Sequence, residues 1–200
     1  MTTTLFLVRH GETVWHRENR YAGVSDVALT PGGHEQADRL GRWAEKAALD
    51  AVWCSPRSRA RMTAAPAAAA LGLALRVDND LREVDFGTAE GRTLAELDPA
   101  TVAAFRADPV LGAFPEGEDP RAAAARAVAA LERITARHPG GRVLVVAHNT
   151  LLRLVLCSVL QIPLSSYRAA FPQVRNCALT ELRHDGGSAA LLAYNVPLPD

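Results

Sequence analysis

The stretch LFLVRHGETVWH (residues 5–16) joins a short apolar run to a group of polar side chains. The run of Leu, Phe, Leu and Val ends abruptly at Arg9 and His10, and a second histidine, His16, follows six residues later. A continuous apolar run of this length is typical of a strand that is covered on both faces, as in a parallel sheet. We therefore expect a buried strand over residues 4–9 that holds Arg9 and His10 at its carboxyl end.

Three further apolar runs have the same character, and they cover residues 50–55, 73–78 and 142–147. Between the runs, three dipeptides combine an N-cap residue with a first-turn proline and predict helix starts. These dipeptides are Thr30-Pro31, Ser55-Pro56 and Asp119-Pro120. We expect the first helix to run to about Ala48, the second to be kinked or interrupted at Pro66, and the third to end near His138.

The alternation of strands and helices predicts an α/β fold. We expect a three-layer sandwich with a mostly parallel central sheet and helices on both faces. Residues 177–196 are typical of two strands joined by a Gly186-Gly187 turn, which would form an antiparallel edge. Residues 79–118 contain no convincing strand, and they indicate a lid-like excursion. Chain length favours one domain over residues 1–200.

Composition excludes several classes of function. The formal net charge is zero, so nucleic acid and anionic membranes are not expected partners. The chain has one lysine and 21 arginines, so an arginine is informative only through its position. The three cysteines have no metal-ligand spacing, which predicts no metal site. No segment has the character of a secretory signal or a membrane span, and we expect a cytoplasmic protein.

The strand ends bring charged and titratable side chains together. Arg9 and His10 follow the first strand, Arg59 follows the second, and His148 follows the fourth. The carboxyl ends of parallel strands share one edge of the sheet, where ligands bind. Guanidinium groups around a histidine favour binding of a phosphate or carboxylate, and they keep the imidazole neutral and nucleophilic.

A proton donor for a leaving group is expected on the same edge. Glu83 follows the third strand and is the best candidate, with Asp85 and Glu90 as nearby alternatives.

Several motifs in order along the chain resemble the histidine phosphatase superfamily, which includes cofactor-dependent phosphoglycerate mutases and small phosphatases. LVRHGETVW is similar to the Arg-His-Gly signature of this superfamily, and CSPRSRARMTA is similar to its Ser-Pro-x-x-Arg-Ala-x-x-Thr-Ala block. The other matching segments are YAGVSDVALTPGGHEQA, LREVDFGTAEG, PEGE and VLVVAHNTLLR. The matches span most of the chain, which makes the resemblance specific.

The resemblance implies a role for each matching residue. His10 would carry the phosphoryl group as phosphohistidine, and Glu83 would protonate the leaving group and then deprotonate water. The phosphoryl oxygens would be held by Arg9, Arg59 and His148. Secondary substrate contacts would come from Thr13, Gly23 and the backbone of Asn149. The chemistry implied needs no cofactor and no metal ion.

The chain departs from the pattern of the superfamily at three positions. His16 stands where Asn is usual, Asn149 where Gly is usual, and Ala28 where Pro is common. His16 can donate a hydrogen bond as Asn does, or strengthen anion binding when it is cationic. We count His16 among the predicted substrate contacts.

Three hypotheses follow. The first is a phosphoric monoester hydrolase that acts on a small phosphorylated metabolite. The second is a phosphoglycerate mutase-type enzyme that returns the phosphoryl group to substrate; the short chain favours hydrolysis. The third is an inactive phospho-ligand-binding module, and the presence of the full set of site residues argues against it. A homodimer is possible, since an exposed sheet edge could pair.

Overall fold

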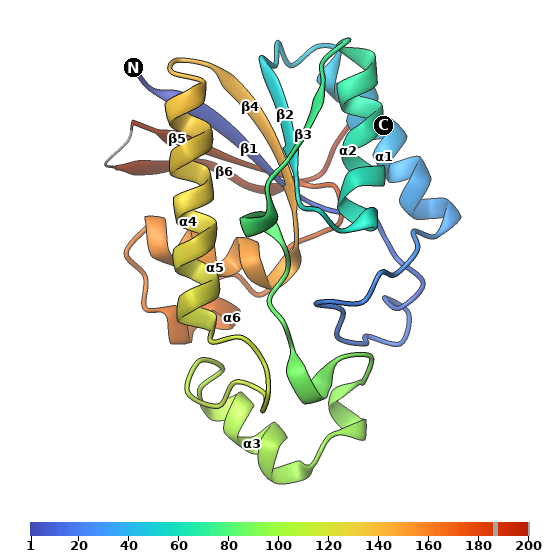
Figure 1. Ribbon diagram of the computed structural model, residues 1–200, viewed down its shortest axis with the longest axis vertical. Coiled ribbons are helices and arrows are strands. Elements are labelled where there is room, and N and C mark those ends of the chain that lie inside the picture. Colours follow the sequence, from blue (N-terminus) through green and yellow to red (C-terminus); the bar gives the residue numbers. More distant parts are fainter. Residues whose placement is uncertain (186–187, 200) are drawn as a thin grey trace.

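A six-stranded sheet runs through the middle of the molecule in the order β3-β2-β4-β1-β5-β6 (Figure 1). The computed structural model describes residues 1–185 and 188–199. Its strands are β1 (Thr3–Arg9), β2 (Ala51–Cys54), β3 (Leu75–Val77), β4 (Arg142–Ala147), β5 (Leu179–His184) and β6 (Ala189–Val196). Strands β1 to β4 are parallel, and β5 is antiparallel to both β1 and β6. The predicted fold class is thus confirmed, while the predicted turn at Gly186-Gly187 lies outside the described residues.

Helices cover both faces of the sheet because the strands are apolar on both faces. Phe6 and Val8 of β1 belong to a buried cluster with α1 (Pro31–Ala44) and α2 (Ser58–Ala70). Leu5 and Leu7, which point to the opposite face, belong to a second cluster with α4 (Pro120–Arg137) and α5 (Asn149–Val159). Burial on both sides explains the continuous hydrophobicity of β1 and its rigidity as a support for Arg9 and His10.

Two of the three predicted helix starts are confirmed, and the third is wrong. Thr30 accepts a hydrogen bond from Gly33 N and caps α1, and Asp119 caps α4 in the same way through Arg121 N. Helix α2, however, begins at Ser58 with Arg57 as its N-cap residue. The reason is that Ser55 N still bonds to β4 and its hydroxyl contacts His148.

Of the two alternatives for Pro66, a kink or an interruption, the interruption is wrong, because α2 continues through Pro66 to Ala70. A side chain at Gly41 of α1 would stand 3.1 Å from Pro66 Cβ, so the two helices approach closely at this point. Helix α1 ends at Ala44, and turns lead to Ala48, which has a positive φ of 50°.

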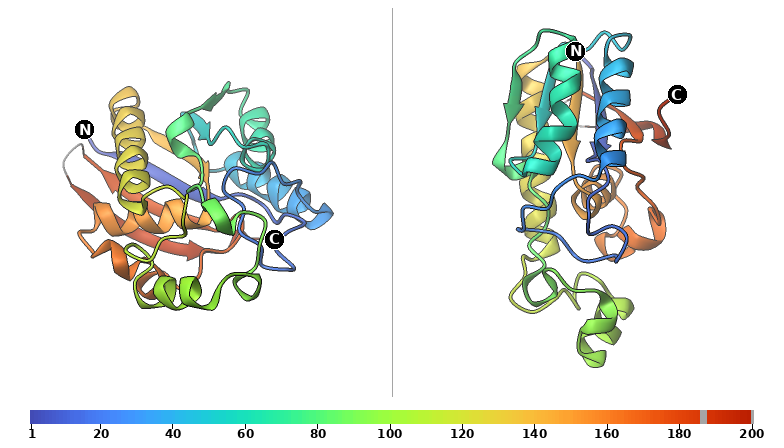
Figure 2. Two further views of the ribbon diagram at one scale, coloured as in Figure 1. Left: turned by 60° about the horizontal axis from the view of Figure 1, so that its bottom comes forward. Right: turned by 90° about the vertical axis from the view of Figure 1, so that its right-hand side faces the viewer.

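Residues 79–118 extend beyond the carboxyl ends of the parallel strands, where Figures 1 and 2 show them in green. They contain the 3-10 helices η1 (Asn79–Leu81), η2 (Gly87–Ala89) and η3 (Leu94–Glu96) and the helix α3 (Pro99–Ala107). Helix α3 was not predicted, although Asp98 caps it and Pro99 follows, the same signature as in α1 and α4. The segment from α5 to β5 holds η4 (Leu164–Ser166) and α6 (Tyr167–Ala170).

None of the helices in the described ranges combines the length and apolar character that a membrane crossing requires. Within the same ranges, His, Cys, Asp and Glu side chains do not gather in groups of three or more that could hold a metal ion.

Candidate active site

The register between β1 and β4 places two histidines side by side. Arg9 is paired with Ala147, so His10 and His148 are the next residues of two adjacent parallel strands. His10 N donates to Ala147 O at 3.0 Å, which extends the ladder by one bond. The two imidazole rings then lie 5.2 Å apart between centroids. This register brings together the two strand ends that the sequence predicts to be neighbours.

His10 is held in one tautomer. Its side chain is 5% exposed, and its Nδ1 lies 2.7 Å from the carbonyl oxygen of Gly11. A carbonyl can only accept, so Nδ1 carries the proton and the lone pair is on Nε2. Burial lowers the pKa of His10 well below its usual value, and the charges of Arg59 and Arg9 lower it further. His10 is therefore neutral, with one nucleophilic nitrogen.

His148 is completely buried and presents one unused ring nitrogen. Its Nε2 lies 2.6 Å from Ser55 Oγ, and Ser55 Oγ also accepts the Arg57 N–H at 3.3 Å. The Ser55 proton is then free to donate to Nε2, which leaves the ring proton on Nδ1. Nδ1 has no partner among the described residues. Burial and the charge of Arg59 lower the pKa of His148, so the ring is neutral. Its Nδ1–H can donate a hydrogen bond to an anion.

Arg9 is fixed at the end of β1 by two bonds. Nη1 donates to Val174 O at 2.8 Å, and Nη2 donates to His16 Nε2 at 2.6 Å. Burial lowers the pKa of Arg9 to about 10, although the charge of Glu83 opposes the shift. Arg9 therefore keeps its positive charge at neutral pH. Its Nε is buried and makes no hydrogen bond within the part of the protein that the structure describes.

His16 acts as an acceptor for Arg9, which was not foreseen. Nε2 accepts from Arg9, while Nδ1 accepts the Thr13 N–H at 2.9 Å and lies 2.8 Å from Thr13 Oγ1. Asn176 Nδ2 is 3.2 Å from the same Nε2 and donates to His10 O at 2.7 Å. Burial and then the charge of Arg9 lower the pKa of His16 to about 4. His16 is therefore neutral at neutral pH, and stronger anion binding by a cationic ring stays a prediction for pH values below this pKa.

Arg59, on α2, is the largest fully buried side chain of the site. Its terminal nitrogens donate to Ser25 O and Ala22 O, each at 2.8 Å, and to Gly23 O at 3.3 Å. Its Nε lacks a partner in the described ranges. Gly23 is needed here for its small size, because a Cβ would stand 2.2 Å from Val84 O. Its N–H donates to Glu90, so the backbone of Gly23 holds Arg59 in place.

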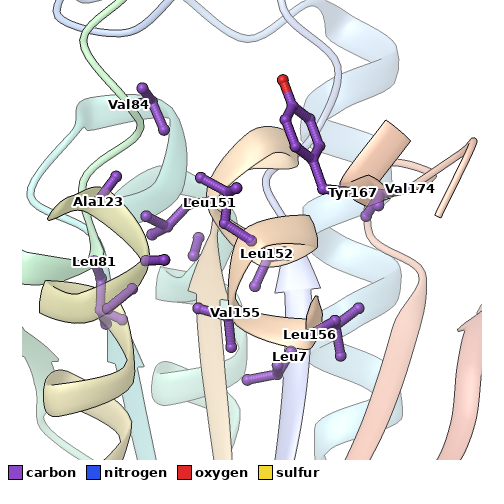
Figure 3. Packing of buried hydrophobic residues seen from close by; sticks show 14 of the residues in the cluster. Leu7, Leu81, Val84, Ala123, Leu151, Leu152, Val155, Leu156, Tyr167 and Val174 are labelled. Atoms are coloured by element: carbon purple, nitrogen blue, oxygen red, sulfur yellow. The ribbon is translucent and has the colours of Figure 1, made fainter. Parts of the chain in front are cut away.

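The side chain of Glu83 is buried against the N-terminus of α5. Its carboxylate accepts from Val84 N, Thr150 N and Leu151 N at 2.9–3.0 Å. Burial raises the pKa of Glu83, while the three N–H bonds and the charge of Arg59 oppose the shift. A raised pKa favours the protonated carboxyl group that a general acid requires. The flanking Leu81 and Val84 are 2% and 4% exposed and fix the segment in the core beside α4 and α5 (Figure 3).

A cavity of about 210 Å³ opens between these groups. The predicted residues that line it are Arg9, His10, Thr13, His16, Glu83 and Asn149. Arg59 and His148 lie behind the lining, fully buried, and Gly23 is outside it. The two alternatives to Glu83 are also outside it, because Asp85 caps Gly87 N and Glu90 binds the backbone of Gly23 and Ser25.

Sequence reasoning missed several polar residues of the site, including Asn19 and Arg20, which line the cavity. Arg153 and Arg168 line the cavity from α5 and α6, and Asn176 bonds to both His10 and His16. Arg153 could have been found, because it is one helical turn after Asn149 and so shares its face. Arg168, on the short helix α6, and Asn176, between α6 and β5, carry no such signal.

Comparison with known proteins gives one family. The family model described as the histidine phosphatase superfamily, branch 1, matches residues 5–197. A curated relative named probable phosphoglycerate mutase GpmB, from Erwinia tasmaniensis, is 33% identical over 184 residues, which is 90% of this chain and 84% of the relative.

Solved structures agree with this match. YhfR from Bacillus stearothermophilus is 32% identical with a TM-score of 0.90, and the alignment covers 97% of each chain. A mycobacterial glucosyl-3-phosphoglycerate phosphatase, solved in complex with VO3, is 28% identical with a TM-score of 0.88, and the alignment covers 96% of this chain and 99% of that chain. Phosphatases and named mutases thus both occur among the similar proteins.

Proposed function

Because the chain belongs to the histidine phosphatase superfamily of phosphatase and mutase enzymes, we propose that it hydrolyses a small phosphorylated metabolite through a phosphohistidine on His10. The observation that carries this proposal is the tautomer of His10. Nδ1 donates to Gly11 O at 2.7 Å, so the Nε2 lone pair is available for attack on phosphorus. The reaction needs no metal ion in this proposal.

In the first step, Nε2 of His10 forms a bond to phosphorus and the ester oxygen leaves. Glu83, whose pKa is raised by burial, gives its proton to that oxygen, so that an alcohol is released. Arg9, Arg59 and His148 stabilise the charge on the phosphoryl oxygens through their unused buried N–H groups.

In the second step, Glu83 is a carboxylate and accepts a proton from a water molecule. The water oxygen bonds to phosphorus, the N–P bond breaks, and inorganic phosphate leaves. His10 returns to its neutral form and Glu83 to its protonated form, so that the cycle is balanced. The low pKa of His10 supports this return, because a neutral ring is the form that can attack again.

We further propose that the chain is one domain in which residues 79–118 act as a lid. Besides Glu83, the side chains of Phe86 and Leu94 from this segment line the cavity. Tyr21, which also lines it, packs edge-on against Phe86 and Phe114 at centroid distances of 4.9 and 5.0 Å. This aromatic contact ties the segment to the loop after β1 and would keep bulk water away from the phosphoenzyme.

The test is turnover with p-nitrophenyl phosphate and a panel of phosphate esters, in the presence of EDTA. We expect release of inorganic phosphate and a phosphoenzyme that is labile in acid. His10→Ala should remove both, while His34→Ala, an exposed histidine of α1, should behave as wild type. Label retained in His10→Ala would place the nucleophile elsewhere.

The same panel separates the other hypotheses. Conversion of 3-phosphoglycerate to 2-phosphoglycerate faster than hydrolysis would establish the mutase, which the name of the curated relative keeps as the second candidate. Absence of turnover with every ester would leave a phospho-ligand-binding module.

A further inference from the structure

A second cavity, which we call the side cavity, adjoins Glu83. It has a volume of about 270 Å³ and is lined by Glu83, by Arg57, the N-cap residue of α2, and by charged side chains of two neighbouring segments. Two of its lining residues, Val24 and Glu116, are exposed, so the side cavity opens to solvent. Glu83 is the residue that it shares with the 210 Å³ cavity of the active site. The proposed proton donor thus borders two cavities.

The side cavity has the character of a hydrated space. Six of its eight lining residues are charged, and a volume of about 270 Å³ corresponds to roughly nine water molecules at ~30 Å³ each. Part of this charge is already satisfied within the protein. Glu118 accepts from Arg126 Nε at 2.7 Å, and Asp85 accepts from Gly87 N at 2.9 Å. A polar lining with its own partners favours water over an organic ligand.

Arg57 is the exception, because its guanidinium makes no hydrogen bond or ion pair within the described part of the chain. Its Nε is buried. Burial lowers the pKa of Arg59 and of His148, and the charge of Arg57 lowers both further, so Arg57 lies near the phosphate site. Buried donors without a protein partner are satisfied by ordered water. Arg57 can therefore hold water between solvent and Glu83.

The main cavity is enclosed and holds the alcohol part of the ester. Arg20, in the loop after β1, joins that loop to residues 79–118 through bonds to Gly91 O at 2.7 Å and Glu96 at 2.9 Å. Tyr21 and Phe86 line the same cavity and contact each other. In the proposed first step the alcohol is released into this space of about 210 Å³. Water that used the same entrance would have to wait until the alcohol had left.

The second step requires water on one particular side of phosphorus. His10 Nε2 is bonded to phosphorus from one side, so in-line displacement places both the ester oxygen and the attacking water on the opposite side. Glu83 exchanges a proton with each of these oxygens in the proposed reaction, so Glu83 marks that side. The side cavity reaches Glu83 without passing through the main cavity.

We propose that the side cavity is the water entrance of the phosphoenzyme, and that Arg57 is a positioning residue that holds the incoming water next to Glu83. The water gives its proton to Glu83 and its oxygen to phosphorus, the N–P bond breaks, and inorganic phosphate leaves. A separate entrance supplies water while the alcohol still occupies the main cavity, which favours hydrolysis over return of the phosphoryl group to substrate. This inference rests on the proposed phosphohistidine reaction and extends it to the path of the water.

The test measures the two chemical steps separately. Rapid-quench experiments with p-nitrophenyl phosphate, stopped in alkali, give the rate constants for formation and for decay of the phosphoenzyme. Val24→Trp places a large ring at the side cavity, and it should slow decay several-fold and leave formation unchanged. Arg57→Met keeps the length of the side chain but removes its donors. It should slow decay by on the order of 5–10-fold, the effect of one lost hydrogen bond to a charged group, and slow formation less.

Each variant has a matched control. Val24 and Val196 are 43% and 44% exposed, and Val196, on β6, lines neither cavity. Arg61 is an exposed arginine one turn after Arg57 on α2, and it also lies outside both cavities. Val196→Trp and Arg61→Met should both keep the two rate constants of the wild type.

The outcomes are distinct. If the wild type forms no phosphoenzyme, the proposed function itself fails. If the phosphoenzyme forms but decays at the rate of the wild type in both Val24→Trp and Arg57→Met, water enters through the main cavity and the inference is wrong. Slower decay in only one of the two variants would overturn the half of the inference that the other variant tests. Equal slowing of formation and decay in Arg57→Met would assign Arg57 to phosphate binding and remove its positioning role.

Discussion

Replacing Arg126 by glutamine is expected to destabilise the protein and to displace its proposed proton donor. Arg126, on α4, binds both oxygens of Glu118, at 2.7 and 2.8 Å. It also donates to the carbonyl oxygens of Asp80, Arg82 and Glu83 at 2.6, 2.8 and 3.2 Å. The side chain of Arg126 thus fixes the backbone from which Glu83 extends.

The magnitude follows from the burial of this pair. The side chains of Arg126 and Glu118 are 11% and 16% exposed. Loss of the arginine leaves a largely buried carboxylate and three carbonyl groups without their donor, and partial access of water reduces the cost. We expect a decrease of about 3 kcal/mol in the free energy of unfolding. For a chain of 200 residues this corresponds to a decrease of about 6–12 °C in Tm.

Arg133→Gln is the matched control on the same helix. Arg133 contacts Asp78 and Asp80, but its side chain is 45% exposed. An exposed pair contributes little, so we expect a change below about 1 kcal/mol.

Acid unfolding adds a second readout. Burial raises the pKa of Glu118, but Arg126 outweighs this and lowers it. The stability gained from a lowered carboxyl pKa is present above ~4.3 and is lost as pH falls through the folded value. The difference between the wild type and Arg126→Gln should therefore shrink in acid.

The catalytic readout distinguishes a positioning residue from a purely structural one. Arg126→Gln should slow hydrolysis of esters with poor leaving groups more than that of p-nitrophenyl phosphate, whose leaving oxygen hardly needs a proton. The assay is kcat for a series of phosphate esters ordered by leaving-group pKa, measured well below Tm. Equal slowing of every ester, or unchanged Tm, would refute the reasoning.

Three further predictions concern the cavity itself. Glu83→Gln should lower kcat for alkyl phosphates by on the order of 10²–10⁴-fold with a much smaller effect on p-nitrophenyl phosphate; an equal effect would argue against the acid role. Arg59→Lys should lower kcat/KM for p-nitrophenyl phosphate by on the order of 10²–10³-fold, and a loss below about tenfold would show that Arg59 is peripheral. The lowered pKa of His16 means that the unfolded chain binds a proton more readily between pH 6.5 and about 4. The free energy of unfolding of the wild type should therefore fall faster than that of His16→Asn as pH decreases through this window, in denaturant titrations; parallel pH profiles would contradict it.

The layers of the fold were predictable because the central strands β1, β2 and β4 are apolar over almost their whole length. In β1 and β4 nearly every side chain is buried, so the sheet had to be covered on both faces. The cap-plus-proline signature then located α1 and α4 to the residue.

The predictions of helix boundaries failed where tertiary contacts involve the residues that carry the local signal. Ser55 has the sequence of an N-cap residue, but His148 and the β4 ladder use it. Pro66 should break a helix in isolation, but the packing of α2 against Gly41 of α1 keeps the helix continuous. Local propensity is a weak prior that such contacts override.

The positions of the site residues were predictable to the extent that strand ends position them. Arg9, His10 and His148 follow paired strands, and their proximity needs only the parallel register. Arg153 was overlooked because it is one arginine among 21, although its position one helical turn after Asn149 places it on the same face of α5.

His16 shows why one residue can be located and still be misread. The sequence places it near the strand end, and two roles, donor or cation, are open to an imidazole there. The structure selects a third role, because Arg9 and Asn176 both present N–H groups to Nε2, at 2.6 and 3.2 Å. With these donors on Nε2 the ring keeps a lone pair there, and burial, followed by the charge of Arg9, lowers its pKa to about 4. The substitution of His for Asn thus changes the group that orients Arg9, while the charge that faces the phosphate still comes from Arg9 itself.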